Sequence, residues 1–322
     1  MAELIQIETA PASPRFAGDE GARPRRIPEW LTIRLPRRGQ IEEVSSLMRA
    51  QNLVTVCEEA RCPNLSECWS KKTATFMIMG DTCTRSCRFC AVKTGKGGAL
   101  DPDEPRRVAE SAGALGLKHT VVTSVNRDEL ADGGAWHFAE TIRQLRALLP
   151  DTIIEVLTPD FLGNKANIQI VVDAKPHVYN HNVETVPRLY RRVRPQARYP
   201  RSLQLLQYVK RADPGIYTKS GFMVGLGETR EEVVALLEDL KAHDVDAVTI
   251  GQYLRPGKKY LEVVEYVHPD VFAEYKAIGE SMGFLFVASG PFIRSSYNAK
   301  EFSDKFLAER AAAVQTAQPT TL

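Results

Sequence analysis

The sequence predicts an α/β protein: a partial (β/α)6 barrel of the TIM type, with N-terminal and C-terminal extensions covering its open side. Apolar segments of β type alternate along the chain with segments of helical spacing, an order that implies a parallel sheet with helical crossovers. Six such units are too few for a closed eight-unit barrel. A cysteine motif begins three residues after the first expected strand, and barrels of this type carry function on the loops that follow the strands.

Six short apolar segments are the expected strands. In chain order they are residues 75–80 (TFMIMG), 120–125 (TVVTSV), 153–157 (IIEVL), 178–182 (VYNHN), 221–224 (GFMV) and 247–253 (AVTIGQY). Most of the segments between them repeat apolar residues at helical intervals. The clearest repeats are Ile142, Leu145 and Leu149, then Val233, Leu236, Leu237 and Leu240.

The composition is that of an ordinary globular protein. The chain has 322 residues, of which 43% are hydrophobic and 25% charged, and its formal net charge is +2. These values argue against a disordered, collagen-like or coiled-coil chain. No apolar segment approaches the roughly 18 residues of a membrane-spanning helix, and the first residues lack the features of a targeting peptide. We therefore expect a cytoplasmic protein with no membrane partner.

Five parts are expected along the chain. Residues 1–25 and 308–322 lack periodicity and are predicted to be mobile tails. The parts between them are an N-terminal extension at 26–70, the barrel at 71–290 and a C-terminal extension at 291–307.

The cysteines are the unusual feature, because all six lie between positions 57 and 90. They form two groups of three, namely Cys57, Cys62 and Cys68, then Cys83, Cys87 and Cys90. Clustering in a long chain favours metal or redox chemistry over a disulfide scaffold. Groups of three suit structural zinc poorly, whereas three thiolates on a 4Fe-4S cluster leave one iron free for another ligand. One zinc ion bound by four of the six cysteines remains the alternative.

The second cysteine group has the spacing C-x3-C-x2-C, reads CTRSCRFC and carries Phe89 before its last cysteine. This pattern resembles the radical S-adenosylmethionine (SAM) superfamily. The resemblance implies a 4Fe-4S cluster on Cys83, Cys87 and Cys90, whose remaining iron binds the amino and carboxylate groups of SAM. It also makes Phe89 a candidate for contact with SAM. One electron then cleaves SAM to methionine and a 5'-deoxyadenosyl radical. The superfamily's fold is a partial six-unit barrel with this loop after the first strand.

The wider sequence is similar to one family, the lipoyl synthases, over about residues 25–306. The matching segments are CEEARCPNLSECW, GDTCTRSCRFCAVKTGK, DEPRRVAE, DGGAW, HNVETVPRLY, KSGFMVGLGET, QYLRP and GPFIRSSY. The resemblance implies a sulfurtransferase that inserts two sulfur atoms at C6 and C8 of a protein-bound octanoyl-lysine, giving lipoyl-lysine and consuming two SAM molecules per lipoyl group. Methylene C–H bonds offer nothing to acid–base or nucleophilic catalysis, so radical chemistry fits this substrate.

The resemblance also gives the cysteine groups different roles. Cys57, Cys62 and Cys68 are implied to hold an auxiliary 4Fe-4S cluster that is sacrificed as the sulfur donor. The fourth ligand is implied to be a serine of the RSSY motif at 294–297, and we expect Ser296 rather than Ser295. An alkoxide is a harder iron ligand than a thiolate, so it suits a cluster that must open.

Polar residues at the ends of later strands are further candidates. His181, Asn182 and Glu184 lie at the end of the fourth expected strand. They either contact SAM, as we expect for Asn182 and Glu184, or have a structural role as helix caps or hydrogen-bond partners in the core. Lys219 either contacts substrate or SAM, or forms a structural ion pair. The GLGE segment at 225–228 either approaches a ligand or makes a tight turn.

Eight basic residues and no acidic residue lie between positions 188 and 211. They form a solvated face, a nucleic-acid site or a docking surface for an acidic carrier domain. The balanced overall charge argues against nucleic acid. The expected partners are an octanoylated lipoyl carrier protein or domain, an electron donor such as a flavodoxin or ferredoxin, and a cluster-repair protein; we expect a monomer. Two alternative functions stay open, a radical SAM methylthiotransferase and a zinc-stapled binding module.

Overall fold

The computed structural model describes residues 4–5, 26–34, 40–70 and 74–296. The two expected tails, and the C-terminal extension after position 296, therefore lie almost wholly outside the described residues. The exception is β1 (Leu4–Ile5), which pairs antiparallel with β2 (Ile33–Arg34). No helix in the described part of the chain is long and apolar enough to cross a membrane.

The core of the fold is an eight-stranded sheet in the order β12-β11-β10-β9-β8-β7-β4-β3. Seven strands run parallel, and only β3 (Val54–Thr55) is antiparallel to its neighbour. The parallel strands are β4 (Thr75–Ile78), β7 (His119–Ser124), β8 (Ile153–Leu157), β9 (Val178–Asn180), β10 (Tyr217–Val224), β11 (Ala247–Gln252) and β12 (Phe286–Gly290). In the described residues β3 and β12 do not pair with each other, so the barrel is open.

All six predicted strands are confirmed, and β12 is a seventh that was not predicted. It was missed because small and polar residues make up most of its five positions. β10 begins at Tyr217, earlier than predicted, because Thr218, Lys219 and Ser220 hid its start in the sequence. All three of these side chains are buried.

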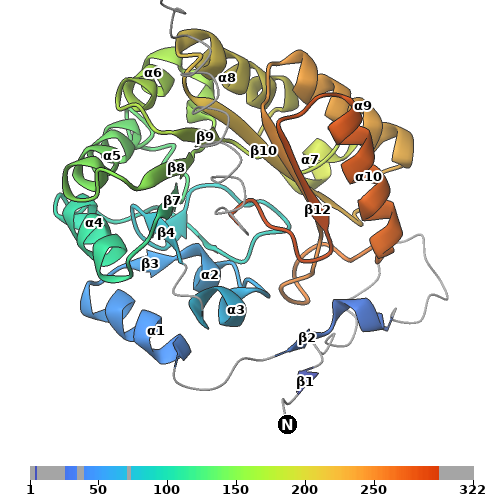
Figure 1. The fold of residues 1–322 in the computed structure, drawn as a ribbon, viewed down its shortest axis with the longest axis horizontal. Helices are drawn as coiled ribbons and strands as arrows, with labels where there is room; N and C mark the ends of the chain where they lie inside the picture. The colour runs from blue at the N-terminus through green and yellow to red at the C-terminus, as the bar shows by residue number, and fades with distance from the viewer. Residues whose placement is uncertain (1–3, 6–25, 35–39, 71–73, 297–322) are drawn as a thin grey trace, which may run out of the picture.

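Helices cover the outer side of the sheet (Figure 1). They are α4 (Glu104–Ala114), α5 (Ala135–Leu148), α6 (Lys165–Asp173), α8 (Tyr199–Ala212), α9 (Arg230–Ala242) and α10 (Pro269–Ser281). The predicted repeat in α9 is confirmed, since Val233, Leu236, Leu237 and Leu240 are fully buried. This helix starts with a capping box between Thr229 and Glu232, which satisfies backbone N–H groups at its N-terminus.

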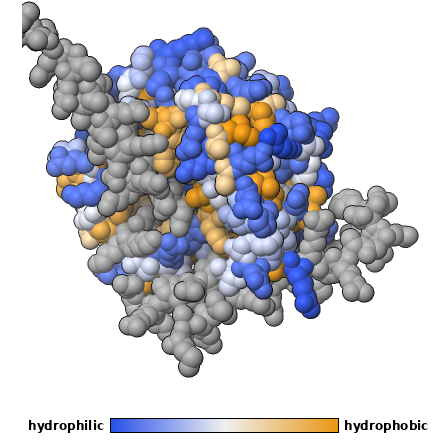
Figure 2. Space-filling view, turned by 45° about the vertical axis from the view of Figure 1, so that its right-hand side comes forward, coloured by the Kyte–Doolittle hydropathy of each residue, from blue (hydrophilic) through white to orange (hydrophobic). Residues whose placement is uncertain are grey.

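Shorter elements fill the open side and the carboxyl ends of the strands. α1 (Gln40–Ala50), α2 (Val56–Glu59) and α3 (Leu65–Ser70) lie beside β3 and β4, and the segment after β12 runs back toward them (Figure 1). The remaining short elements are η1 (Glu29–Leu31), β5 (Thr82–Cys83), β6 (Lys93–Thr94), η2 (Phe161–Gly163), η3 (Pro187–Leu189) and α7 (Tyr190–Val193). Figure 2 shows a surface that is mostly hydrophilic on the face it presents, with separate hydrophobic patches.

Candidate active site

The second cysteine group lies on the loop that follows β4, as predicted. The beginning of this cysteine loop is held against the loop after β7, because Thr84 N donates to the Asn126 carbonyl at 3.0 Å. The Arg85 guanidinium donates to both carboxylate oxygens of Asp128, at 2.7 and 2.8 Å, and to Asp160 at 2.6 Å. Arg85 is buried, and its ion pairs hold the pKa of Asp160 well below the ordinary range. The cysteine loop is thus tied to the ends of β7 and β8.

Cys83, Cys87 and Cys90 line a cavity of about 660 Å³ at the carboxyl ends of the strands. Phe89, Asn182 and Glu184, all predicted SAM contacts, line the same cavity. Several buried polar atoms around it have no hydrogen-bond partner in the described part of the chain. These atoms are Ser124 Oγ, Asn126 Oδ1, Asn182 Oδ1 and Arg194 Nε. Since buried polar groups normally find partners, the cavity fits a polar ligand.

Asn182, Glu184 and Arg194 form one connected group beside Cys87. Asn182 Nδ2 donates to Glu184 Oε1 at 3.1 Å, and Arg194 Nη1 donates to the Asn182 carbonyl at 2.7 Å. Glu184 has a positive φ of 66°, and its backbone bonds to Gly221 and Met223 on β10. This backbone pairing holds Glu184 beside β10, where it lines the cavity.

Burial is the main cause of the raised pKa values of the acidic groups beside the cavity. It raises the pKa of Glu184, while the Arg194 guanidinium opposes that rise. It also raises the pKa of the Cys87 thiol, and that of Cys90 to about 12. Without a metal these thiols hold their protons at neutral pH, so loading of a cluster must release protons.

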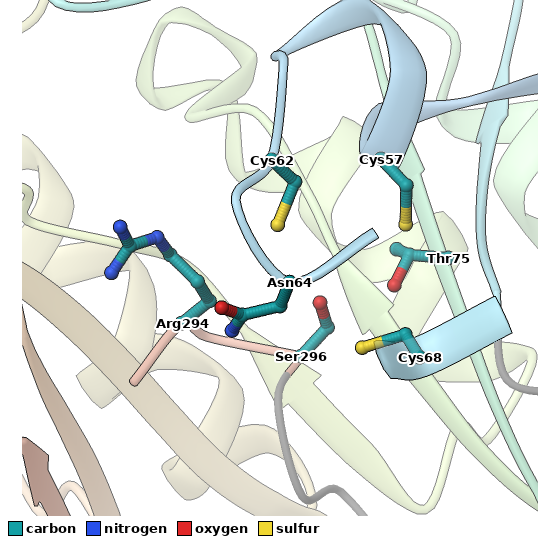
Figure 3. Close-up of a pocket in the computed structure, with 7 residues that line it drawn as sticks. All are labelled: Cys57, Cys62, Asn64, Cys68, Thr75, Arg294 and Ser296. Carbon is teal, nitrogen blue, oxygen red and sulfur yellow. The ribbon is translucent and has the colours of Figure 1, made fainter. Parts of the chain in front are cut away.

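The first cysteine group forms a small pocket, adjoining the main cavity, with residues from the far end of the described chain (Figure 3). Its lining residues are Cys57, Cys62, Asn64, Cys68, Thr75, Arg294 and Ser296. In Figure 3 the three sulfur atoms and the Ser296 hydroxyl point into the same space. Burial raises the pKa of the Cys57 thiol to about 11. Ser295, the alternative ligand, lines the main cavity instead.

Backbone hydrogen bonds hold the first cysteine group together. Cys62 N donates to the Cys57 carbonyl, and Cys68 N donates to the Asn64 carbonyl, both at 2.9 Å. The Asn64 side chain then donates to the Phe292 carbonyl at 2.7 Å, which ties this group to the segment after β12. That segment passes over Gly251 of β11, where any Cβ would clash with the Ile293 carbonyl oxygen.

Neither cysteine group is arranged as a site for a single metal ion. Within the described residues, no three His, Cys, Asp or Glu side chains converge on such a point. A 4Fe-4S cluster takes one thiolate per iron, so its ligands are spread around the cluster and do not converge on one point. Each of the two pockets is lined by the three thiols of one cysteine group, which fits that requirement. The smaller pocket adds a serine hydroxyl, and the main cavity adds polar atoms without a hydrogen-bond partner in the described part of the chain.

Three other candidates have structural roles. Lys219 and Glu155 form a fully buried ion pair at 2.9 Å, so Lys219 forms a structural ion pair and is not a ligand contact. The GLGE segment is a tight turn, in which Glu228 accepts the N–H groups of Gly225 and Leu226.

His181 lines the cavity, but both its ring nitrogens already have partners, the Thr158 carbonyl at 2.8 Å and the Ser202 hydroxyl at 2.9 Å. Burial lowers the pKa of His181 to about 4, so it is neutral at pH 7.

Sequence reasoning missed Arg85, Arg194 and Arg294. Arg85 lies inside the cysteine motif, but the C-x3-C-x2-C spacing specifies only the cysteines and not the residues between them. Arg194 was counted with the basic segment at 188–211, although it is 9% exposed and touches the cavity. Arg294 precedes the expected serine ligand and lines both pockets.

Comparison with known proteins decides which family this site belongs to. Residues 77–240 match the radical SAM superfamily. The chain is 57% identical to the lipoyl synthase of Rubrobacter xylanophilus over 274 residues, covering 85% of each chain. It is 58% identical to the lipoyl synthase of Caldanaerobacter subterraneus subsp. tengcongensis, covering 85% of this chain and 96% of that one. The chain belongs to the lipoyl synthase family.

Membership in the lipoyl synthase family confirms the predicted activity. The protein is a radical SAM sulfurtransferase, and its cofactors are 4Fe-4S clusters and SAM, which it uses as a co-substrate. Its substrate is an octanoylated lipoyl carrier, the acceptor of the two inserted sulfur atoms. The methylthiotransferase and zinc-module alternatives are not supported.

Solved structures show the same fold at low sequence identity. Streptococcus suis SuiB bound to its precursor peptide SuiA is 13% identical with a TM-score of 0.53, covering 77% of this chain and 52% of that chain. HydG, a maturase of the FeFe hydrogenase, is 17% identical with a TM-score of 0.53, covering 77% and 62% of the two chains. These likenesses concern the fold alone.

Proposed function

We propose that the two pockets divide the lipoyl synthase reaction between them. Cys83, Cys87 and Cys90 hold the cluster that binds SAM, in the main cavity. Cys57, Cys62, Cys68 and Ser296 hold the auxiliary cluster, whose sulfur is transferred. The observation that carries this assignment is the pocket that unites three cysteines with a serine more than 200 positions later in the chain.

The donor sets support different uses of the two clusters. When bound, the clusters and SAM supply the electron, the radical and the sulfur atoms. The Ser296 hydroxyl is the one oxygen donor of the proposed auxiliary set, and iron prefers thiolate over alkoxide. Ser296 is therefore the ligand that is released first when the auxiliary cluster opens.

Arg194, Asn182 and Glu184 orient SAM in this proposal. The unpartnered Arg194 Nε–H is buried beside Cys87, and a carboxylate is the partner that best satisfies a guanidinium. The free Asn182 Oδ1 and the Glu184 carboxyl accept hydrogen bonds from amino or hydroxyl groups. Phe89 covers the ligand with an apolar ring.

The same cavity receives the octanoyl chain. Its lining includes apolar side chains from both halves of the protein, among them Val56, Met77, Val92, Phe222 and Leu254. Arg294 and Ser296 line both pockets, so the cavity reaches the auxiliary pocket. An apolar lining excludes water and holds the chain near the sulfur source, which a reactive carbon centre requires.

Two cysteine variants test the division of roles. Cys87→Ala is expected to abolish formation of 5'-deoxyadenosine, whereas Cys68→Ala is expected to keep it and lose sulfur insertion. Both are measured anaerobically with an octanoyl-lysine peptide, by mass spectrometry of nucleoside and peptide products. If Cys68→Ala abolished nucleoside formation while the SAM cluster remained intact, the assignment would be wrong.

The proposal extends to domains and partners. The N-terminal extension at 26–70 and the C-terminal extension at 291–307 supply the auxiliary site, and the barrel at 71–290 supplies the SAM site. The reaction further needs a one-electron donor, such as a flavodoxin or ferredoxin, and a protein that rebuilds the auxiliary cluster. Each role follows from chemistry that consumes one electron per SAM and one cluster per product.

A further inference from the structure

The protein surface next to Cys87 is built from two segments that contact each other. Ser86 and Arg88 flank Cys87, and both are exposed. Arg88 N donates to the Val193 carbonyl at 2.9 Å, and the Gln196 side chain donates to the Ser86 hydroxyl at 3.0 Å. The cysteine loop therefore lies directly against the end of α7.

This surface is strongly basic. Four arginines on it are exposed, namely Arg88, Arg191, Arg192 and Arg198; we call them the cysteine-loop basic surface. No acidic residue occurs at positions 86–88 or 188–211. Two acidic groups on neighbouring segments are already paired, Glu232 with Arg188 at 2.7 Å and Glu262 with Arg255 at 3.4 Å. A partner of opposite charge would meet uncompensated positive charge here.

The position of this surface points to its use. Cys87 is half-buried directly beneath it and contacts Arg194, which comes from the same segment as Arg191 and Arg192. If the SAM cluster is held by Cys83, Cys87 and Cys90, as proposed above, this surface adjoins it, because Arg88 follows Cys87 in the sequence and bonds to Val193 of α7. The auxiliary pocket is instead built from segments on the open side of the barrel.

We propose that the cysteine-loop basic surface docks a small acidic protein that carries one electron. The docked carrier is oxidised by one electron and the cluster on the three cysteines is reduced by one; no covalent bond forms. Redox encounters use small interfaces, below about 1,200 Å², so a docking site of this kind needs only a small part of the protein surface. Charge complementarity mainly raises the association rate, and salt screens it. This inference rests on the proposed cluster assignment.

The test compares two reductants on one variant. Arg191→Glu with Arg192→Glu reverses two charges of the surface, and Lys118→Glu with Arg211→Glu is the matched control. Lys118 and Arg211 are exposed and lie at the amino ends of β7 and β10, away from the cysteine loop. Each protein is given SAM and an octanoyl-lysine peptide, with either reduced flavodoxin or dithionite. The readout is the initial rate of 5'-deoxyadenosine formation at several salt concentrations.

With flavodoxin at low salt, the Arg191/Arg192 variant is expected to be about tenfold slower than wild type, and the difference should shrink as salt rises. With dithionite it should match wild type, and the control should match wild type throughout. Equal losses with both reductants, no loss with flavodoxin, or an equal loss in the control would each overturn the proposal. So would a loss seen only when an octanoylated carrier protein replaces the peptide, because the surface would then dock the substrate. Absence of lipoyl product in wild type with dithionite would instead overturn the proposed function.

Discussion

Arg194 shows how far a residue's role depends on its environment rather than on its neighbours in the sequence. It is one of eight basic residues, of which five are exposed, namely Arg188, Arg191, Arg192, Arg198 and Arg211. Arg194 instead turns inward, contacts the Tyr190 ring and bonds to the Asn182 carbonyl. The sequence predicted the charge of this segment correctly, but it could not show that one member lies in the active site.

Arg194→Gln is expected to weaken SAM binding. A hydrogen bond to a charged group contributes about 1.5–3 kcal/mol, so the KM for SAM should rise about tenfold or more in the dithionite assay. Arg211→Gln, an exposed member of the same segment, is the control and should leave the KM unchanged. Iron content must be measured in both, because Arg194 also contacts Cys87. An unchanged KM in a fully loaded Arg194→Gln protein would contradict the assignment.

The buried Lys219–Glu155 pair gives a prediction about stability. Glu155 also bonds to His119 and Asn180, each at 3.0 Å, and has no exposed surface. Lys219→Met leaves this carboxylate without its main counter-charge, so the free energy of unfolding should fall by about 3–5 kcal/mol. Adding Glu155→Gln should restore a large part of it, because the uncompensated charge is gone. Anaerobic urea unfolding measures both; equal stability of the single and double variants would exclude this charge effect.

The same pair predicts a pH dependence. Its interactions lower the pKa of Glu155 from 4.5 to about 2, against the effect of burial. A carboxyl group with a lowered pKa stabilises the folded protein above its unfolded pKa, and that contribution is lost as pH falls from 4.5 toward 2. The loss is about 3 kcal/mol for a shift of this size. In urea unfolding, the Lys219→Met, Glu155→Gln double variant should lose less stability than wild type over this range.

At the scale of elements, segments dominated by apolar or β-branched residues could be predicted as strands even with a polar position such as Glu155 of β8, whereas segments of mostly small or polar residues could not. β7, β8 and β11 were found from their apolar residues, whereas the start of β10 and all of β12 were not. The reason is physical: a buried lysine is compatible with a strand only when a partner such as Glu155 neutralises it, and that partner lies on another strand. The cysteine spacing was visible locally, but the role of Ser296 came only from the family resemblance.

The segment after β12 depends on a missing side chain in β11. Gly251→Ala places a methyl group against the Ile293 carbonyl oxygen, so the segment that carries Ser296 must move. We expect the auxiliary cluster to lose iron while 5'-deoxyadenosine formation continues, measured by iron analysis and by Mössbauer spectroscopy. Gly98→Ala is the control, since a Cβ there meets nothing within 4 Å. Full loading of both clusters in Gly251→Ala would show that the segment tolerates the shift.

At the scale of the whole molecule, the barrel and the auxiliary site are stabilised differently. Most of the parallel strands and their helices share one large buried core, which also includes Cys57 and Trp69 of the N-terminal segment, and a second small cluster lies at Ile153, Val178, Ala247 and Phe286. The auxiliary pocket instead joins two segments that are far apart in the chain, and the Asn64 bond to Phe292 and the packing over Gly251 link the C-terminal segment to the rest. A cluster bound at this pocket would therefore act as a cross-link between the two ends of the fold.

Removing the clusters should loosen this junction and leave the barrel intact. Metal binding at a site that is not fully formed without it contributes directly to folding free energy, and local opening occurs where few contacts hold a segment. In anaerobic hydrogen exchange, residues 57–68 and 291–296 are expected to lose protection in the cluster-free protein, whereas β8, β9 and β10 keep theirs. Ser296→Ala loaded with both clusters should show an intermediate protection at 291–296, because it removes one of the four proposed ligands. Equal protection of these segments with and without clusters would mean that protein contacts alone hold the auxiliary site closed, and opening of that site would then have to come from the reaction itself.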